Sequence, residues 1–500
     1  MALVNLPPEL LLRVSTFLTT TELGNFRLTN KHVERTLFDS FAREFFTKKQ
    51  FMLEQISLQA LVDISKHPTL SLRLSEVVIG TQVFPPDPEL ASSFGRAMSE
   101  AGYVHHEVLM ATGQAMHMLA AAFSRLPNLR TVGLRDYNGL GRYRDGEFAT
   151  WKSWGWSFGW EHQDTYLPSG QYHRTLRIIP PESILPVILY ALGTANVVPE
   201  SIHVFLRKHA KLTPRSFNVL DGYMGEKIRP VLGEMKELML AIALDSPYPS
   251  FMPSLPPDSR TATDATLARL LQCMPKLQTL RLNFDPHQSL GSHFLGWLGS
   301  PVPGTPTLSP SSTISSVALP NLTALELGML NVPASVLLKV LTKFNLESFS
   351  MWKCVLHSAS LDNEEDCLRP LLHDLAVALP QSTRLKSVLI GFPSQMYCDN
   401  GFGFGREDPI CFKPVGAGDV GTYDKAELKS EVKHHAGPGT SMKDWLEMLS
   451  KRTHIRTPEE YSDISLSPET VHSDILDPDE ERDDDGDEDD DEDTDEDEDE

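Results

Sequence analysis

The stretch NLTALELGMLNVPASVLLKVLTKFNLESFSM, residues 321–351, contains two copies of one short pattern. In the first copy Leu322, Leu325 and Leu327 follow the spacing LxxLxL, which predicts a short buried strand. The run SVLLKVLTKF then predicts a helix, and NLESFSM repeats the strand. Because each helix-plus-strand unit leaves an apolar face that only a neighbouring unit can cover, the stretch indicates an array of stacked units.

The same pattern recurs along the chain, usually after a helix that ends in Leu-Pro or Met-Pro. The strands begin at Leu129, Leu277, Leu322, Leu346 and Leu385, and MKELMLAIAL (residues 235–244) adds a further candidate. These starts are 148, 45, 24 and 39 residues apart, whereas a regular leucine-rich repeat keeps a period of about 20–29 residues. We therefore predict an α/β fold, an irregular leucine-rich-repeat-like solenoid over residues 49–456. A compact α/β or all-helical domain is the alternative.

Three insertions are expected to interrupt the array, at residues 136–171, 301–316 and 393–421. The first contains four of the seven tryptophans: Trp151, Trp154, Trp156 and Trp160. Because tryptophan is enriched in binding hot spots, these four are candidate substrate-binding residues. The alternative is that they pack the insertion against the solenoid as a small satellite core.

The other two insertions have the composition of loops. Residues 301–316 carry no charge and almost no large apolar side chain, which predicts disorder. Residues 393–421 form a stretch expected to be irregular, with GFGFG at 401–405, Cys398 and Cys411.

The first fifty residues predict three short amphipathic helices. Pro7 and Pro8 suit the first turn of a helix, and Thr19 followed by Glu22 is a capping box for a second one. Val33, Leu37, Phe41 and Phe45 recur every fourth residue in the third. A further helix is predicted from Phe51 to Lys66, followed by a strand at SLRLSEVVIG, residues 71–80.

Residues 6–29 resemble the F-box, the helical motif that docks onto the Skp adaptor of cullin-RING ubiquitin ligases. The resemblance rests on Leu6-Pro7-Pro8-Glu9-Leu10, then Val14, Leu18, Leu23 and Phe26-Arg27-Leu28-Thr29. Residues 46–81 are similar to the segment that follows the F-box in many filamentous-fungal F-box proteins. Residues 1–48 would then be the F-box. The adaptor-binding residues that the resemblance implies are Leu6, Pro7, Glu9, Leu10, Val14, Leu18, Leu23, Phe26 and Leu28.

Two positions depart from the F-box pattern. Gly24 stands where F-boxes usually carry Leu, and Val33 lies near the usual place of a Trp. Glycine inside a helix costs about 1 kcal/mol relative to alanine. An ordinary three-helix cap on the following domain is the alternative to an F-box.

Charge and cysteine usage bound the class of protein. Of the net charge of −23, residues 477–500 contribute −19, from 20 acidic residues and one Arg. We expect residues 457–500 to be a disordered acidic tail, and the mildly acidic remainder offers no footprint for nucleic acid. Five sparse cysteines fit a reducing compartment. No signal peptide or membrane span is predicted, so the expected location is cytoplasmic, nuclear or both.

No sequence signature of catalysis is present: there is no phosphate-binding loop, HExxH or GxSxG. The pairs His105-His106 and His434-His435 lack further ligands at metal spacing. We expect no enzyme activity, catalytic residue, cofactor or metal. The resemblance implies the substrate-recognition subunit of an SCF-type cullin-RING ubiquitin ligase. Its partners would be the Skp adaptor, through it a cullin, and an unknown target protein, without nucleic acid or membrane.

Two other functions remain open on the sequence. One is a non-catalytic protein-interaction scaffold that acts outside ubiquitination. The other is an acidic-tail chaperone for basic proteins such as histones.

Overall fold

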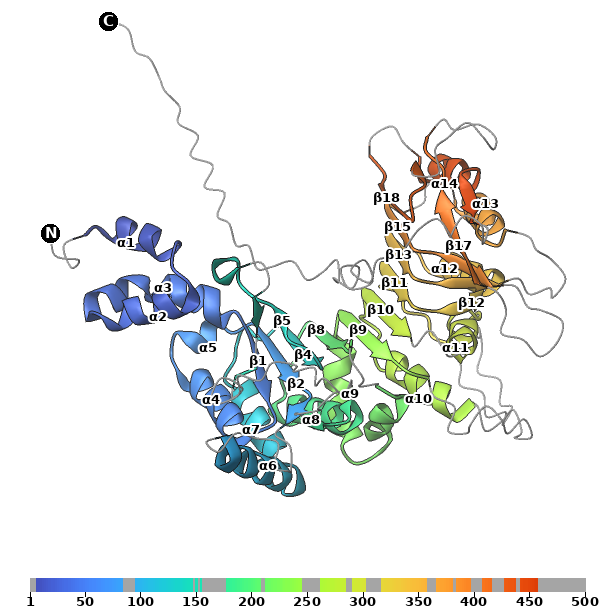
Figure 1. Cartoon of the computed structure of the whole chain (residues 1–500). Coiled ribbons are helices and arrows are strands. Elements are labelled where there is room, and N and C mark those ends of the chain that lie inside the picture. Colours follow the sequence, from blue (N-terminus) through green and yellow to red (C-terminus); the bar gives the residue numbers. More distant parts are fainter. Residues whose placement is uncertain are drawn as a thin grey trace, which may run out of the picture. The chain divides into compact units, whose positions relative to one another are not determined.

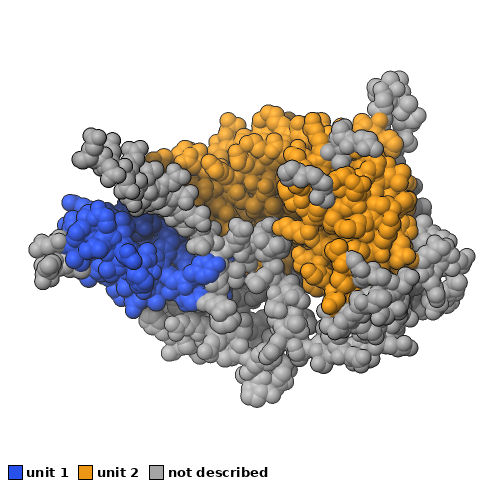
Figure 2. All heavy atoms as spheres, turned by 90° about the horizontal axis from the view of Figure 1, so that it is seen from above, with its two compact units in different colours: residues 1–46, 138–152, 466–500 blue, residues 47–137, 153–465 orange. Residues whose placement is uncertain are grey.

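Figure 1 shows a computed structural model of the chain. It describes residues 6–83, 95–146, 149–151, 153–154, 177–207, 212–244, 261–284, 290–302, 316–357, 366–380, 384–396, 407–415, 427–437 and 441–456. The described residues fall into two compact units, coloured separately in Figure 2. Unit 1 contains residues 6–46 and 138–151, and unit 2 contains the rest.

Unit 1 is built on three helices, α1 (Pro8–Ser15), α2 (Thr20–Leu28) and α3 (Lys31–Phe46). Its core consists of buried side chains from all three helices: Leu11, Leu23, Val33, Leu37 and Phe45. The predicted capping box is present, because Thr19 and Glu22 each accept from the other's backbone N–H at the start of α2. Residues 138–151 add β5 (Gly139–Leu140), the 3-10 helix η3 (Tyr143–Asp145) and β6 (Thr150–Trp151) to this unit.

Unit 2 contains a ten-stranded sheet whose strands follow one another in the order of the chain. The order is β1 (Lys48–Met52), β2 (Glu76–Gly80), β4 (Thr131–Arg135), β8 (Ser201–Phe205), β9 (Glu237–Ile242), β10 (Thr279–Phe284), β11 (Ala324–Gly328), β13 (Ser348–Trp352), β15 (Ser387–Gly391) and β18 (Glu431–His435). Neighbours pair parallel up to β15, and β18 is antiparallel to β15. A parallel sheet in chain order is the topology of a solenoid, which excludes an all-helical domain.

Helices connect successive strands and pack as a second layer on one side of the sheet (Figure 1). They are α4 (Gln55–Lys66), α5 (Leu70–Arg73), α6 (Gly95–Ala111), α7 (Gln114–Phe123), α8 (Pro181–Ala195), η5 (Pro214–Asp221), α9 (Gly225–Glu234), α10 (Thr261–Gln272), α11 (Leu290–Leu298), α12 (Ala334–Lys343), α13 (Leu368–Ala378) and α14 (Met442–Ser450). Between the layers lies a continuous apolar core, in which Leu238, Leu280, Leu325, Phe349 and Val388 are register neighbours on successive strands and all buried.

A second sheet borders the C-terminal repeats. It contains β12 (Asn331–Pro333), β14 (Val355–His357), β16 (Ser394–Met396), β17 (Glu407–Phe412) and β19 (Thr453–Ile455). The turn from the main sheet into β12, β14 and β16 begins each time with a left-handed residue: Met329, Lys353 and Phe392, at φ of 50°, 51° and 49°. A two-stranded pair, β3 (Gln82–Val83) with β7 (Arg177–Ile178), completes the described strands.

The six strands predicted from apolar spacing are confirmed as β4, β9, β10, β11, β13 and β15. The long interval between Leu129 and Leu277 contains the predicted β9 and also β8, which was not predicted, so the array is more regular than the Leu spacing indicated. Residues 393–421 were expected to be irregular, which is wrong for β16 and β17. Their strands pair with β14 and β19 and bury Cys411.

Two local predictions near the start of unit 2 are wrong. Phe51 lies in β1, and α4 begins only at Gln55, because Phe51 is fully buried opposite Ile79 of β2. Residues 70–73 form α5, so the strand predicted over 71–80 is restricted to Glu76–Gly80. Trp156, Trp160, residues 303–315, GFGFG with Cys398, and the tail 457–500 lie outside the described residues.

Candidate functional site

Helix α1 exposes a row of apolar side chains. Leu10 is 48 % exposed, Val14 42 % and Phe17, just after the helix, 79 %. Leu10 and Val14, four residues apart, lie on one side of α1, and Phe17 follows in the turn after the helix, whereas Leu11 belongs to the core and is fully buried. We call Leu10, Val14 and Phe17 the α1 row. Leu28, at the end of α2, is 85 % exposed.

The nine residues that the resemblance implies for adaptor binding divide into three classes by exposure. The exposed ones are Pro7, Glu9, Leu10, Val14 and Leu28. Leu6, Leu18 and Phe26 are half-buried against the core of unit 1, and Leu23 is buried inside it. Leu23 therefore packs in the core beneath the surface, while the α1 row and Leu28 are accessible to a partner. Phe17 was not in the predicted set, although its spacing from Leu10 and Val14 signals it.

Charged groups in unit 1 hold its aromatic side chains in place. The Arg27 guanidinium lies 3.4 Å above the centre of the Phe41 ring, a cation–π contact. Burial lowers the pKa of Arg27 from its ordinary value, an effect that the nearby Glu34 carboxylate opposes.

At the other end of α2, hydrogen bonds from the Thr19 backbone and hydroxyl lower the pKa of Glu22, so the capping carboxylate stays ionised.

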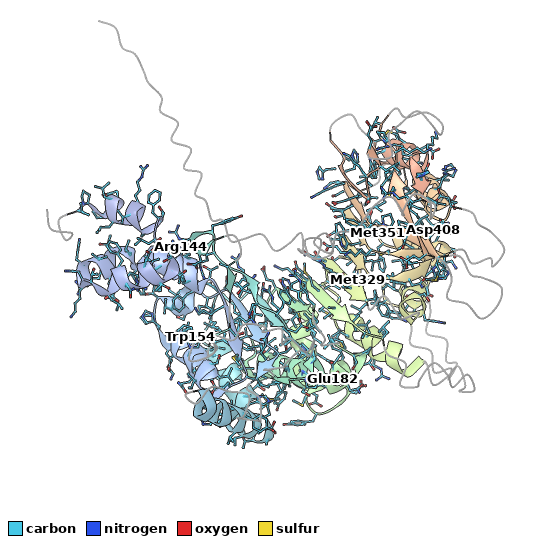
Figure 3. All side chains as sticks on the ribbon, in the orientation of Figure 1. Arg144, Trp154, Glu182, Met329, Met351 and Asp408 are labelled. Carbon is cyan, nitrogen blue, oxygen red and sulfur yellow. The ribbon has the colours of Figure 1, made fainter. Side chains whose placement is uncertain are left out.

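Trp154 is attached by its backbone to the free edge of β1. Its N–H donates to the Gln50 carbonyl at 2.8 Å, and its carbonyl accepts from the Ser57 hydroxyl at 2.7 Å. The Lys49 ammonium lies 4.8 Å from the ring centre, and the side chain is half-buried (Figure 3). These contacts favour a packing role for Trp154 over a recognition role. Trp151 lies in β6, and its side chain is not described.

The open face of the main sheet, opposite the helices, carries polar and charged side chains. Adjacent strands are joined across it by the ion pairs Lys48–Glu76 (3.2 Å), His203–Glu237 (2.5 Å) and Arg281–Glu326 (3.7 Å). The guanidinium groups of Arg135 and Arg281 lie 6.0 and 5.8 Å from the Phe205 ring centre. Mixed charges around aromatic rings suit a protein surface better than a run of phosphates.

Cys354 and the histidines His106 and His434 are each held by packing or hydrogen bonds in the structure. Burial raises the pKa of Cys354 to about 11, which keeps this thiol protonated and unreactive at neutral pH. His434 stacks on Trp445 at 4.6 Å, and burial, with His435 beside it, lowers its pKa. The buried His106 hydrogen-bonds the Leu53 carbonyl through Nδ1 at 2.8 Å. The described residues contain no group of three metal-ligating side chains.

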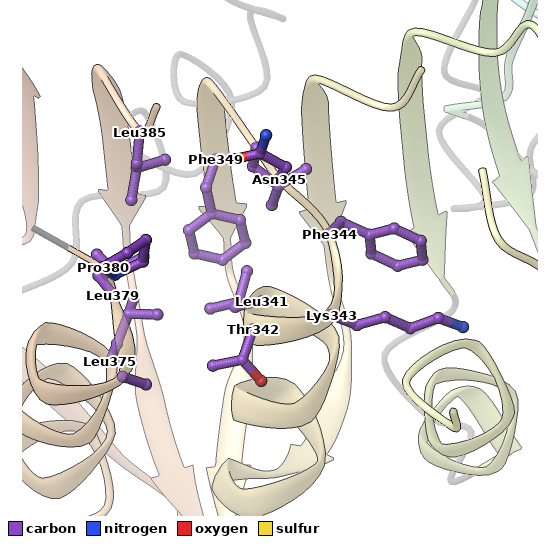
Figure 4. Close-up of a pocket in the computed structure, with 12 residues that line it drawn as sticks. Leu341, Thr342, Lys343, Phe344, Asn345, Phe349, Leu375, Leu379, Pro380 and Leu385 are labelled. Carbon is purple, nitrogen blue, oxygen red and sulfur yellow. The ribbon is translucent and has the colours of Figure 1, made fainter. Parts of the chain in front are cut away.

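A cavity of about 180 Å³ lies where α12 and α13 end (Figure 4). Its walls are mostly aliphatic and aromatic: Leu341, Phe344, Phe349, Leu375, Leu379 and Leu385 contribute. Pockets for small molecules usually span about 300–1,000 Å³, so this one is small for a cofactor. No helix among the described residues has the length and apolar character needed to cross a membrane.

No protein-family model matches the chain, and no curated protein matches it. Among solved structures, the leucine-rich repeat-containing protein LegL7 from Legionella pneumophila is similar at 10% sequence identity and a TM-score of 0.28. The match covers 69% of this chain and 90% of LegL7. At so low a TM-score the similarity supports no conclusion about function. We describe unit 2 as a solenoid because of its own strand order.

Proposed function

We propose that this protein is the substrate-recognition subunit of an SCF-type cullin-RING ubiquitin ligase. Unit 1 would bind the Skp adaptor, and the solenoid of unit 2 would bind a target protein. The chain would catalyse nothing itself. It would raise the effective concentration of the target near the ubiquitin-loaded enzyme.

The observation that carries this proposal is the α1 row. Soluble monomers rarely expose contiguous apolar patches, so an exposed apolar row beside a separate core suggests a protein interface. The core of unit 1 is formed by other side chains, Leu11 and Leu23 among them, and the α1 row is not part of it. The row lies within the residues that resemble the F-box.

The solenoid supports the second half of the proposal. Its open face presents ion pairs, arginines and Phe205 over many successive strands. Extended surfaces of this kind are typical binding faces of repeat proteins. A target bound there would be held by many dispersed contacts, with no need for a deep pocket.

The experiment compares adaptor binding after changes in the α1 row with adaptor binding after a change at another exposed leucine of α1. In the full chain, Leu10→Ala combined with Val14→Ala should weaken binding of purified Skp adaptor. Each half-exposed side chain buries apolar surface worth about 1–1.5 kcal/mol on binding, so affinity should fall about 30- to 150-fold. Leu12→Ala is the control: Leu12 is also exposed on α1, but it is two residues from both Leu10 and Val14 and therefore lies on another side of the helix. It should leave affinity unchanged.

Thermal melts of all three proteins exclude unfolding as the cause, since exposed side chains contribute little to stability. Equal adaptor binding by the double variant and the wild type would reject the F-box assignment. Recovery of the adaptor without a cullin from cells would instead support a scaffold that acts outside ubiquitination.

A further inference from the structure

The turn η3 joins unit 1 from almost one hundred residues beyond α3, and Arg144 is its main contact (Figure 3). The Arg144 guanidinium forms a bidentate ion pair with the Glu44 carboxylate of α3: Nε donates to Oε1 at 2.5 Å and Nη2 donates to Oε2 at 2.6 Å. The same guanidinium donates from Nη1 to the carbonyls of Ser15 at 2.9 Å and Leu18 at 2.7 Å. One side chain thus links α3 to the end of α1.

Asp145 makes the complementary contact at the start of α2. Its Oδ1 accepts from the Thr20 backbone N–H at 2.7 Å, and its Oδ2 accepts from the Thr20 hydroxyl at 2.5 Å. A cation therefore meets the C-terminal carbonyls of α1, and an anion meets the N-terminal N–H groups of α2. Both charges have the sign that stabilises the helix end they touch.

Arg142 adds a third contact to the same side of α3. Its Nη2 donates to the Glu44 carbonyl at 3.1 Å, and its guanidinium lies 4.1 Å from the ring centre of Phe45. Phe45 belongs to the core of unit 1. The turn thus binds to unit 1 through an aromatic core residue as well as through helix ends.

Helices as short as α1 and α2, with 8 and 9 residues, are marginal on their own. Both pack against α3. The corner between them is residues 16–19. Of the two carbonyls that Arg144 binds, that of Ser15 directly precedes this corner and that of Leu18 lies within it. Arg144 and Glu44 are largely shielded, with side chains 12 % and 28 % exposed. Shielding and two-pronged geometry make such a pair far more effective than an exposed one.

We propose that the turn formed by residues 142–145 is a functional part of the adaptor-binding module. Arg144 is a positioning residue: it fixes the corner between α1 and α2, so that the α1 row and Leu28 are presented in one arrangement. The adaptor-binding module then consists of residues 6–46 together with the turn, and it is not contained in the N-terminal segment alone. This inference rests on the proposed function for its binding readout only.

The test compares three variants of the full chain. Arg144→Met removes the charge and all four hydrogen bonds, and Arg144→Lys keeps the charge without the two-pronged geometry. Arg43→Met is the matched control, since Arg43 on α3 pairs with Asp39 at 3.5 Å in an exposed setting. Amide hydrogen exchange is measured over residues 10–28, and affinity for purified Skp adaptor is measured by calorimetry.

Arg144→Met should accelerate exchange across α1 and α2 about tenfold, because their local opening becomes easier. It should also weaken adaptor binding about tenfold, because preorganisation of the surface is lost. The exchange rate and the adaptor affinity of Arg144→Lys should lie between those of Arg144→Met and the wild type. A variant that simply unfolds would not give such intermediate values. Exchange in β9 and β10 of unit 2 should not change.

The two readouts separate the two proposals. If the wild type does not bind the adaptor, the proposed function fails while the exchange data still decide the role of the turn. Unchanged exchange in Arg144→Met, or equal acceleration in Arg43→Met, would overturn the positioning role. Faster exchange with undiminished adaptor affinity would show that the turn stabilises the helices without serving the binding surface.

Discussion

Lys343, in α12, is a half-buried cation, and its surroundings explain both its contacts and its acidity. Its ammonium donates to the Leu298 carbonyl at the end of α11 and to the Ser316 hydroxyl, both at 2.6 Å. A cation at a helix C-terminus is favourable. Burial, however, lowers the pKa of Lys343 from 10.5 to about 8, because desolvation penalises the charged form.

The lowered pKa predicts a pH dependence of stability. Between about pH 8 and pH 10.5 the unfolded chain keeps a proton on Lys343 that the folded chain has lost. The free energy of unfolding should therefore rise with pH across this window. Urea unfolding followed by circular dichroism measures it, with Lys343→Met as the reference that cancels all other titrating groups.

Cys354 makes that reference necessary. Burial raises the pKa of Cys354 from 9.0 to about 11, so this thiol contributes a slope of the opposite sign across a window that overlaps that of Lys343. Relative to Lys343→Met, the wild type should gain stability from about pH 8 upward. Parallel pH profiles for the two proteins would show that the Lys343 ammonium is not significantly desolvated.

At the scale of elements, strands with a regular apolar spacing could be predicted, whereas β1 and β8 could not. β10 and β11 alternate buried leucines with polar residues, which is a strong signal. β1 reads KKQFM and β8 reads SIHVF, and neither has the leucine spacing. Their place in the sheet is set by pairing with β2 and β4, a tertiary effect that local patterns do not contain.

The residues of the candidate site likewise divide into those that the sequence could predict and those that it could not. Helical spacing could indicate the α1 row, because Leu10, Val14 and Phe17 are close in sequence. It could not separate them from Leu23, whose burial depends on packing against α3. Nor could it find Arg144, because no local pattern relates this residue to Glu44.

The left-handed turns after β11, β13 and β15 allow a prediction about one element. Left-handed backbone is usually reserved for Gly or Asn, yet Lys353 has φ of 51° and an exposed side chain. Lys353→Val should destabilise the chain by about 1–2 kcal/mol, because a β-branched residue is a poor fit at positive φ. Lys353→Gly should be neutral or slightly stabilising, since relief of strain offsets the entropy lost by glycine.

Both Lys353 variants remove the same side chain, so the comparison isolates backbone strain. Urea midpoints measured under identical conditions give the difference. Equal destabilisation by Val and Gly would mean that the lysine side chain, and not the backbone angle, determines the effect.

At the scale of the whole molecule, unit 2 is a one-dimensional array in which each repeat touches mainly its neighbours. In such arrays stability is approximately a sum of repeat and nearest-neighbour terms. Its two edge strands are protected differently. Trp154 covers β1 through the backbone hydrogen bond from its N–H to the Gln50 carbonyl, while at the other edge His434 of β18 stacks on Trp445 of α14.

Two tryptophans near opposite ends of the array test this picture. Trp154→Ala should loosen the covering of β1, and Trp445→Ala should remove the ring that stacks on His434 of β18. Because coupling runs between neighbours, amide exchange should accelerate in β1, β2 and α4 for the first variant. For the second it should accelerate in β15, β18 and α13, with the distant end protected in each case.

Trp445 is 8 % exposed and packs in α14 against α13, so its removal should cost about 3–5 kcal/mol locally. Trp154 is half-buried, and its removal should cost less. Hydrogen exchange is measured with peptide resolution, and each variant is the control for the other. Acceleration spread evenly over all ten strands in either variant would contradict the nearest-neighbour picture. It would show that unit 2 unfolds as a single cooperative block.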